Sequence, residues 1–238
     1  MSRPPDQEDL DPLAQQFREF AYIVSHDLSA PLRAASTFSG ILLREYHDRL
    51  DEKGREFLSL VATEASRAQA MLQGLLDYSR LNTMAKTVST KVEAARVFEH
   101  CTIVLDDEMQ KTGATFTAKD LPIIQADAEQ FMQLLLYLFS NALKFIRPGE
   151  KPLIQFNGHE EDDHWHFTVR DNGIGIDARY RDKAFVLFRQ LNPQGEYPGI
   201  GMGLTLSQKI VERHGGRIWL DDDGQPTGIT VHFTIGKP

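Results

Sequence analysis

The segment from Ser25 to Arg33, SHDLSAPLR, sets a proline inside what otherwise reads as a long amphipathic helix. Apolar side chains recur at 4-3-4 spacing before this segment and resume after it with one extra step, which is typical of a helix packed against other helices. Pro31 lacks an N–H and clashes with the carbonyl of Asp27, so we expect the helix to bend or loosen just past His26. The apolar positions are Leu13, Phe17, Phe20, Val24, Leu28, Pro31, Ala35, Phe38 and Leu42.

His26 lies two residues off this apolar seam, on the side of the helix that we expect to face water. An exposed histidine is largely neutral at pH 7, and its nitrogen lone pair is then free to attack an electrophile. Asp27, the next residue, is placed to take up or orient the proton of the ring. A His-Asp pair is weak evidence by itself, so this candidate catalytic pair needs support from the rest of the chain.

Composition limits the class of protein. With 238 residues, 41% of them hydrophobic and 25% charged, the chain is long enough for one or two globular domains. No apolar run approaches the ~20 residues that cross a bilayer, and residues 1–11 are acidic and Pro-rich rather than like a signal peptide. Cys101 is the only cysteine, which excludes intramolecular disulfides and metal sites built from Cys clusters and favours the cytoplasm.

The charge of the chain argues against two kinds of partner. The formal net charge is −8, and neither half of the chain has the basic excess expected of a protein that binds nucleic acid or an anionic membrane. We therefore predict a cytoplasmic protein with no nucleic-acid partner and no membrane segment.

The chain divides near residue 82. Before this point a second apolar series follows a turn at residues 47–51, so we expect two long helices in an antiparallel hairpin. Such a hairpin buries little by itself, and pairing two copies into a four-helix bundle is the natural remedy, so we predict a homodimer. The polar run 82–90 reads as a linker. The second series consists of Phe57, Val61, Ala65, Ala68, Leu72 and Leu75.

The pattern after residue 82 mixes helices and strands in unequal runs, which predicts an α+β sandwich rather than a doubly wound parallel sheet. Asp127 with Gln130 has the spacing of a capping box at the start of a strongly apolar helix. We expect helices at 93–111, 127–146 and 203–214, and strands at 114–119, 153–157, 165–170, 217–220 and 228–235.

The first candidate binding motif, LFSNALKF, ends the apolar helix. Asn141 is a polar residue among Leu and Phe, and a buried side-chain amide needs a partner. Its oxygen is suited to Mg²⁺, and Lys144, one turn later, is suited to a phosphate. The same residues equally fit a helix end that turns toward solvent.

The second motif, DNGIGI, spans Asp171 to Ile176 and follows a strand directly. Gly173 and Gly175 let a ligand approach the backbone closely, and the Asp171 carboxylate is placed to accept a hydrogen bond from an adenine amino group. Asp-Asn-Gly is also among the commonest turn sequences, and taken alone this motif is better explained as a strand-ending turn.

The third motif, PGIGMGL, spans Pro198 to Leu204, and its glycines open a helix at Gly203, where a helix N-terminus offers a phosphate site. It is not a dinucleotide-binding fingerprint, because the glycine spacing differs and no strand leads into it, and it lacks the Gly-Lys-Ser/Thr of a P-loop. The lysine and catalytic-loop motifs of kinases that act on hydroxyl groups are absent from the sequence. Any phosphate binding must therefore belong to another fold.

Together these segments resemble a known family. SHDLSAPLR resembles the phosphoacceptor box of sensor histidine kinases, and the three later motifs resemble, in order, the N, G1 and G2 boxes of the ATP-binding domain shared by histidine kinases, gyrases and heat-shock chaperones. AFVLFRQL, with Phe185 and Phe188, resembles the F box. GEYPGIGMGL through IVERHGGRIWL is especially similar to the lid and following helix of phytochrome-type histidine kinases. The resemblance covers about residues 15–235.

This resemblance implies a two-domain enzyme. Residues 1–82 would form the dimerisation and histidine phosphotransfer hairpin, and 83–238 an ATP-binding catalytic domain of the histidine kinase, gyrase and chaperone type. The implied ligands are ATP and Mg²⁺, and the implied partners are the receiver domain of a response regulator and an upstream sensory domain or sensor protein that is not part of this chain. The implied nucleotide-binding residues are Asn141, Lys144, Asp171, Gly173, Gly175, Phe185, Phe188, Gly199, Gly201, Gly203 and Leu204.

The implied reaction is an ATP-dependent autophosphorylation. His26 attacks the γ-phosphate in line, and catalysis depends mostly on positioning and charge neutralisation. Asp27 fixes the tautomer of the ring or takes its proton. Asp171 would hold the adenine and Asn141 the metal ion, and the phosphoryl group would then pass to an aspartate of the response regulator.

Two residues depart from the family pattern. Tyr137 stands where the family usually has Asn, one turn before Asn141, and Ala30 stands where kinases that dephosphorylate their partner usually have Thr or Asn. Tyr137 keeps open the alternative of a degenerate kinase that acts as a dimeric binding module without catalysis. An ATP-driven clamp of the gyrase or chaperone type would place Glu at Tyr137, so that reading is disfavoured.

Overall fold

The computed structural model of the chain describes residues 12–83, 89–192, 197, 199–222, 224 and 227–238. The chain forms two compact units, Met1–Met84 and Ala85–Pro238, each with buried apolar residues of its own. Residues 84–88 of the predicted linker, and residues 195, 196 and 198 of the predicted lid, lie outside the described residues.

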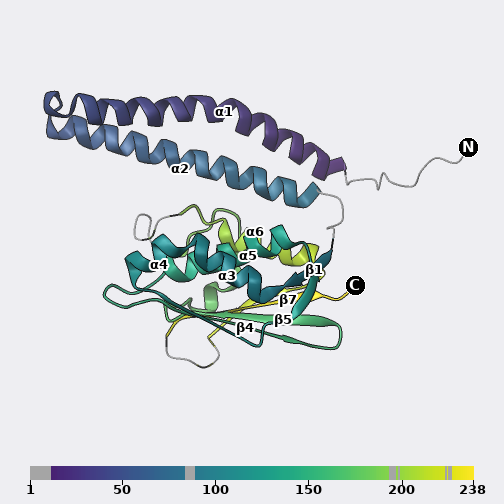
Figure 1. Cartoon of the computed structure of the whole chain (residues 1–238). Helices are drawn as coiled ribbons and strands as arrows, with labels where there is room; N and C mark the ends of the chain where they lie inside the picture. The colour runs from purple at the N-terminus through teal and green to yellow at the C-terminus, as the bar shows by residue number, and fades with distance from the viewer. Residues whose placement is uncertain (1–11, 84–88, 193–196, 198, 223, 225–226) are drawn as a thin grey trace, which may run out of the picture. The chain divides into compact units, whose positions relative to one another are not determined.

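The first unit is the expected helical hairpin (Figure 1). Helix α1 (Pro12–Glu45) and helix α2 (Glu52–Thr83) are joined by a short 3-10 helix, η1 (His47–Arg49). Helix α1 runs without a break through Pro31. No helix of the described part of the chain is long and apolar enough to span a bilayer.

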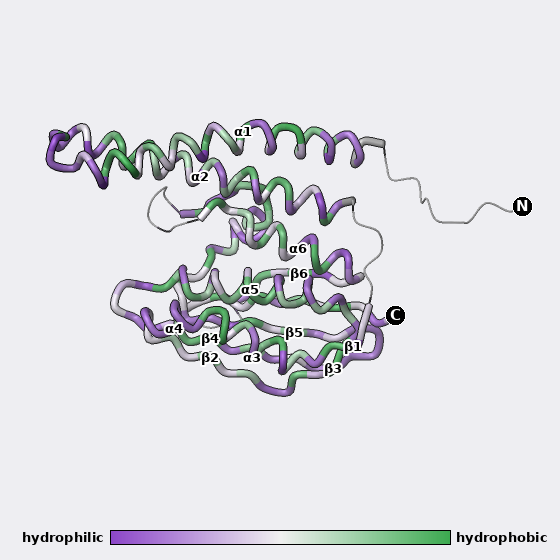
Figure 2. The backbone as a smooth tube through the Cα atoms, turned by 45° about the horizontal axis from the view of Figure 1, so that its top comes forward, coloured by the Kyte–Doolittle hydropathy of each residue, from purple (hydrophilic) through white to green (hydrophobic). Residues whose placement is uncertain are grey.

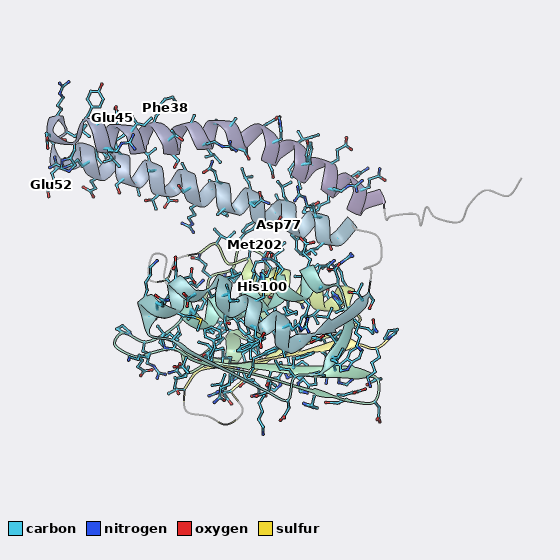
Figure 3. The ribbon with its side chains drawn as sticks, viewed as in Figure 1. Phe38, Glu45, Glu52, Asp77, His100 and Met202 are labelled. Atoms are coloured by element: carbon cyan, nitrogen blue, oxygen red, sulfur yellow. The ribbon has the colours of Figure 1, made fainter. Side chains whose placement is uncertain are left out.

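Only part of the predicted apolar seam packs against α2, where the Phe17 ring meets Tyr78, and the most buried residues of this face are small. Ala21 and Ser25 are fully buried and Ser39 nearly so, whereas Phe38 is 64% exposed (Figure 3). Small side chains let two helices approach closely, which leaves the large apolar side chains outside their contact. Hydrophobic stretches consequently recur along both helices of a single hairpin (Figure 2). The exposed large apolar residues of this unit are Phe20, Tyr22, Ile23, Leu28, Phe38, Leu42, Tyr46, Phe57, Leu60 and Val61.

The second unit is built on a five-stranded sheet of order β2-β4-β5-β7-β6, in which only the β2–β4 pair is parallel. This mixed sheet confirms the α+β prediction, and each of its strands overlaps an expected range. The strands are β2 (Thr115–Lys119), β4 (Leu153–Glu160), β5 (His164–Arg170), β6 (Ile218–Asp221) and β7 (Thr230–Gly236).

Helices α3 (Ala94–Val104), α5 (Ala128–Lys144) and α6 (Gly203–Arg213) lie on one side of this sheet (Figure 1). The core between the two layers is aromatic, and its rings make edge-to-face and stacked contacts at centroid distances of 5.1–6.4 Å. The opposite face of the sheet is more polar, because alternate residues of β5 point away from the core. The fully buried aromatic residues are Phe131, Phe139, Phe156, Phe167 and Phe233.

The prediction of a single helix at 93–111 is wrong. The structure has two helices, α3 and α4 (Asp106–Thr112), separated at Leu105, whose φ of −95° and ψ of 6° are not helical. Three acidic residues occupy the first turn of α4, where they complement the positive end of the helix dipole and favour a new helix start.

A small second sheet was not expected from the sequence. Strand β1 (Thr90–Glu93) pairs antiparallel with β3 (Ile123–Ala126). Each has only four residues, which is too short for a clear alternating pattern. The short 3-10 helices η2 (Ala178–Tyr180) and η3 (Asp182–Phe185) lie between β5 and α6 in the sequence.

The prediction that Asp127 caps α5 is confirmed, but the predicted role of Gln130 in a capping box is wrong. Asp127 Oδ1 accepts hydrogen bonds from the backbone N–H groups of Glu129 and Gln130, both at 3.0 Å. The Gln130 side chain bonds the Asp127 carboxylate instead of completing the capping box. The Asp127 N–H donates to His214 Nε2, 3.1 Å away, so the end of α6 supplies the missing acceptor.

Candidate active site

His26 projects from the hairpin because its neighbours anchor α1. Ser25 is fully buried, and its hydroxyl donates to the backbone carbonyl of Leu72 on α2, 3.4 Å away. This contact turns the next residue outward, and the His26 side chain is 73% exposed. His26 Nδ1 lies 3.1 Å from Asp27 Oδ1, and the Tyr22 ring stacks 6.2 Å away with its plane tilted by 24°. The structure thus gives His26 a hydrogen-bonded carboxylate and an open face.

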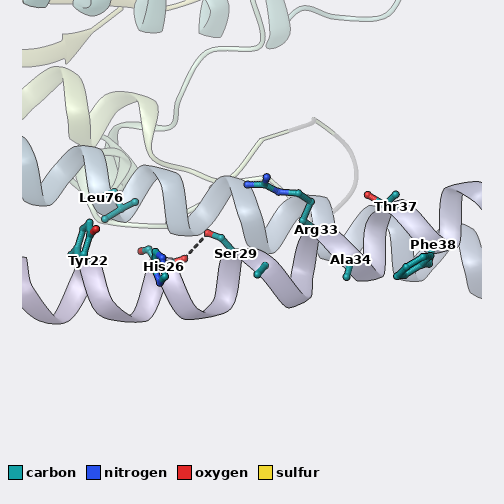
Figure 4. A pocket seen from close by; sticks show the side chains of 10 residues that line it. Tyr22, His26, Ser29, Arg33, Ala34, Thr37, Phe38 and Leu76 are labelled. Atoms are coloured by element: carbon teal, nitrogen blue, oxygen red, sulfur yellow. Dashed lines mark hydrogen bonds between the residues drawn. The ribbon is translucent and has the colours of Figure 1, made fainter.

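A hollow of about 570 Å³ borders His26 (Figure 4). Ala30 lines it, as does Ser29, whose hydroxyl donates to the Ser25 carbonyl. Arg33 lines the same hollow and brings a permanent positive charge beside the histidine. Arg33 was not among the expected site residues, although residues seven apart on a helix, such as His26 and Arg33, share a face.

In the second unit, the end of α5 adjoins the glycine strip. A Cβ placed on Gly203 would lie 3.3 Å from Asn141 Nδ2, and one placed on Gly199 would lie 2.9 Å from Lys144 Nζ. Burial lowers the pKa of Lys144, whose ammonium also lies 4.1 Å from the centroid of the Phe145 ring. The first and third motifs are therefore neighbours in space, although about 60 residues separate them.

Asp171 is held at the start of the second motif by two backbone donors. Its Oδ1 accepts from the N–H of Gly173 at 2.8 Å and from the N–H of Ile229 at 3.2 Å. Burial raises the pKa of Asp171 to about 6, with these hydrogen bonds acting in the opposite direction. Ile229 directly precedes the last strand, β7, far along the chain, and nothing in the sequence identified it as a partner.

Gly173 is required by close packing. A Cβ there would lie 2.2 Å from the carbonyl oxygen of Phe145, and that same oxygen accepts from the Ile174 N–H at 2.9 Å. This contact fastens the second motif to the end of α5. Gly175 has a φ of 73°, in the left-handed region that glycine adopts without strain.

The segment resembling the F box touches the start of α6. The backbone carbonyl of Phe185 accepts from the Thr205 hydroxyl at 2.9 Å, and Phe188 has a φ of 58°. A Cβ on Gly201 would lie 2.7 Å from the carbonyl oxygen of Arg189. Leu204, the second residue of α6, and both Phe side chains are half-buried, so this segment and the glycine strip form one packed region.

Two tyrosines lie near the end of α5. Tyr137 is half-buried on α5, one turn before Asn141, where the sequence departs from the family pattern. The Tyr197 ring packs 5.2 Å from the Phe145 ring, and its hydroxyl lies 3.5 Å from the Ile146 carbonyl. Tyr197 was not among the expected site residues, and its place beside the end of α5 follows only from the fold.

Two family models match the chain in order. The model described as "His Kinase A (phospho-acceptor) domain" matches residues 17–83, and the model described as "Histidine kinase-, DNA gyrase B-, and HSP90-like ATPase" matches residues 126–238. These matches contain the exposed His26 and the region around Asn141 and Asp171, respectively.

Curated relatives include two phytochromes. Cyanobacterial phytochrome A of Nostoc sp. is 38% identical over 229 residues, which cover 95% of this chain and 29% of that protein. Phytochrome-like protein Cph1 of Synechocystis sp. is 35% identical over 219 residues, covering 92% of this chain and 29% of that protein. The chain therefore spans less than a third of the length of these relatives.

Solved structures share the fold. Full-length ShkA in complex with AMPPNP matches with a TM-score of 0.69 at 19% identity, over 92% of this chain and 46% of that chain. Histidine kinase ThkA in complex with the response regulator protein TrrA matches with a TM-score of 0.64 at 20% identity, over 97% of this chain and 68% of that chain.

Proposed function

The chain belongs to the sensor histidine kinases, most like the phytochrome type, and on this premise we propose that it phosphorylates itself on His26. In this proposal ATP is the donor, and the phosphoryl group then passes to an aspartate on the receiver domain of a response regulator. The observation that carries the proposal is the exposed imidazole of His26, hydrogen-bonded to Asp27 and facing an open hollow beside Arg33.

The geometry around His26 suits nucleophilic attack. With Nδ1–H donating to Asp27, 3.1 Å away, the lone pair of Nε2 is free and faces solvent. Nε2 forms the new N–P bond while the bond between the γ-phosphorus and the bridging oxygen of ADP breaks. The ring becomes positively charged as it attacks, and the Asp27 carboxylate stabilises that charge or accepts the Nδ1 proton.

We place the nucleotide in the second unit. The Asp171 carboxylate accepts from the adenine amine, Lys144 meets a phosphate, and the glycines at 199, 201 and 203 form the lid. The amide oxygen of Asn141 is a hard donor of the kind that Mg²⁺ prefers. Bound Mg²⁺ would neutralise negative charge on the phosphates. ShkA was solved with AMPPNP and ThkA with a response regulator, and the same classes of ligand and partner are proposed here.

We also propose that the chain acts as a homodimer through its hairpin and receives its input from a sensory domain or separate sensor protein. The support for the dimer is the set of large apolar side chains that one hairpin leaves exposed on both helices. Burying a single Leu or Phe stabilises an assembly by about 1.5–3 kcal/mol, so a second hairpin is a strong candidate to cover them.

Phe38→Asp is expected to convert the dimer into a monomer. Phe38 is 64% exposed on one hairpin, so a carboxylate there costs the hairpin itself little, whereas in a dimer it would lie in an apolar contact in both copies. Sedimentation velocity measures the result. Ser59→Asp is the matched control, because Ser59 is exposed on the opposite side of α2 from Phe57 and Val61 and should leave the dimer intact. A dimeric Phe38→Asp variant would contradict this interface.

Ala30 predicts weak or missing phosphatase activity toward the partner. Dephosphorylation needs a water held in line with the acyl phosphate, and the family uses a Thr or Asn side chain at this place. Ala30 lines the hollow beside His26, but its methyl group makes no hydrogen bond. The Ser29 hydroxyl, one residue earlier, already donates to the Ser25 carbonyl.

The decay of a purified phosphorylated response regulator measures this activity. We expect decay with the wild-type chain to be close to that without it, and faster decay with Ala30→Thr. Ser29→Ala is the control for the neighbouring hydroxyl. Rapid decay with the wild type that Ser29→Ala does not reduce would mean that another group positions the water.

The proposed function as a whole is tested by incubating the chain with Mg²⁺ and ATP labelled at the γ-phosphate. Label on His26 is the expected result, and transfer of that label to a receiver domain tests the second step.

A further inference from the structure

Four of the eight histidines of the chain lie near one another on the polar side of the five-stranded sheet. His159 on β4 is paired in register with His166 on β5. His166 Nε2 lies 3.2 Å from His232 Nδ1 on β7. His164 completes the group at the start of β5. The kinase proposal uses none of these residues.

One carboxylate lies between two of these rings. Glu161 Oε1 is 3.1 Å from His159 Nε2 and 3.3 Å from His166 Nδ1. One ligand atom from each of the three residues falls within 4.8 Å of the others. Two ligands about 2.0–2.1 Å from a tetrahedral zinc ion lie about 3.4 Å apart, so the spacing of these atoms is close to that of a zinc site.

The backbone explains why the three side chains converge. His159 lies on β4, and Glu161 follows directly after the end of that strand, where its carboxylate reaches back to the His159 ring. The antiparallel register brings His166 directly opposite His159. The Glu161 N–H donates to the His164 carbonyl at 2.8 Å, which closes the hairpin and holds Glu161 beside both rings.

The cluster also has a second layer of partners. Glu161 Oε2 lies 3.1 Å from His164 Nε2, which fixes the carboxylate. The His232 ring is stacked on Trp219 with a centroid distance of 5.0 Å and an interplanar angle of 9°, so it offers His166 Nε2 a fixed partner. Outer hydrogen bonds of this kind set the tautomer and orientation of metal-binding histidines.

We propose that His159, Glu161 and His166 form a binding site for a zinc ion, with water as the fourth ligand. Two imidazoles and one carboxylate are the donor set of many zinc sites with an open position, whereas Mg²⁺ prefers oxygen donors. Side-chain exposures of 59% for His159, 41% for Glu161 and 17% for His166 leave the ion and its water a path from solvent.

The charges around the cluster favour a cation. The nearest ring nitrogens of His159 and His166 both lie within 3.3 Å of the same Glu161 oxygen, so a cation there would meet two nitrogen donors and one carboxylate. Lys237 reaches the same hairpin, where its ammonium is paired with the Glu160 carboxylate at 2.9 Å.

Zinc titration of the full chain by calorimetry, without nucleotide, tests the proposal. The wild type is expected to bind one Zn²⁺ per chain. His166→Ala and Glu161→Gln should each weaken binding by about 100-fold or more, and His164→Ala by about 10–100-fold. His100→Ala is the matched control, because His100 is exposed on α3 of the same unit (Figure 3) and should leave the affinity unchanged. Mg²⁺ at the same concentration should not compete.

Cobalt gives an independent readout, because four-coordinate Co²⁺ has a strong visible absorption that octahedral Co²⁺ lacks. The wild type should show this absorption, and zinc should remove it. Glu161→Gln changes only a partly exposed side chain on a hairpin, so it tests the site even if His166→Ala unfolds. Zinc affinity that is equal in the wild type and Glu161→Gln, or that falls equally in His100→Ala, would show adventitious binding only and overturn the proposal.

Discussion

His26→Gln is expected to abolish labelling of the chain by γ-labelled ATP while its affinity for ATP stays near the wild-type value. Glutamine has no basic ring nitrogen, so the attack on the γ-phosphate cannot begin. The His26 side chain is 73% exposed, so the fold loses little packing. The residues proposed to hold ATP belong to the other unit, Ala85–Pro238, and are unchanged in this variant. Filter-bound label and calorimetry with a non-hydrolysable analogue measure the two quantities.

His47→Gln is the matched control. His47 is exposed on the same unit, and its Nδ1 lies 3.2 Å from Asp48 Oδ1, nearly the same geometry as in the pair at His26. It lies in the turn between the helices rather than on α1 and has no proline following it. We expect full labelling of this variant. Persistent labelling of His26→Gln, or equal loss in both variants, would contradict the assignment of His26.

Asp171→Asn is expected to weaken ATP binding by about 10–100-fold and GTP binding much less. The carboxylate would accept from the adenine amine, and such a charge-assisted hydrogen bond contributes about 1.5–3 kcal/mol. Guanine carries a carbonyl at the same place on its ring, so it gains nothing from the carboxylate. Calorimetry with both nucleotides measures the difference. Equal losses for ATP and GTP would mean that Asp171 does not recognise the base.

The same variant has a second expected effect, which separates lost recognition from lost folding. Burial raises the pKa of Asp171 from 3.8 to about 6, so between these values the folded chain binds a proton that the unfolded chain releases. The contribution of this group to the free energy of unfolding therefore falls as the pH rises from about 4 to about 6, and it stays low above that range. Asparagine does not ionise and keeps an oxygen that can accept from the Gly173 and Ile229 N–H groups.

Asp171→Asn should thus gain stability relative to the wild type, by up to about 3 kcal/mol, between pH 4 and pH 7. Urea unfolding of both proteins across this range measures the gain. A variant that binds ATP poorly while unfolding at higher urea than the wild type at pH 7 would satisfy both expectations. A stability difference that does not change with pH would contradict the raised pKa.

Local periodicity predicted most of the fold. The hairpin and the five strands of the main sheet follow from 3.6- and 2-residue repeats, which are properties of short segments. The pairing of β1 with β3 was missed because four-residue strands carry little pattern. The break at Leu105 was missed although the three acidic residues after it are a local signal for a new helix start. The apolar positions of α1 were predicted to pack against other helices, but several of them are exposed in a single hairpin, and the sequence did not show that the small residues Ala21 and Ser25 face α2.

The sequence predicted which residues belong to the candidate site, but it did not predict which of them contact one another. Asn141 was recognised as a polar residue within an apolar helix, and Asp171 as a carboxylate at the end of a strand. The Ile229 N–H that holds Asp171 lies 58 residues later, and only the sheet register brings the two together. The proposed zinc site was missed for the same reason, because His166 and His159 become neighbours only through the pairing of β4 with β5.

The central claim is that His26 takes a phosphoryl group from ATP, and the most direct measurement is the chemistry of the label on the wild-type chain. After incubation with Mg²⁺ and γ-labelled ATP, we expect label that is stable in base and labile in acid, as a phosphohistidine is, and that maps to the peptide containing His26. Acid-stable label, label on another residue, or no label with ATP bound would contradict the claim.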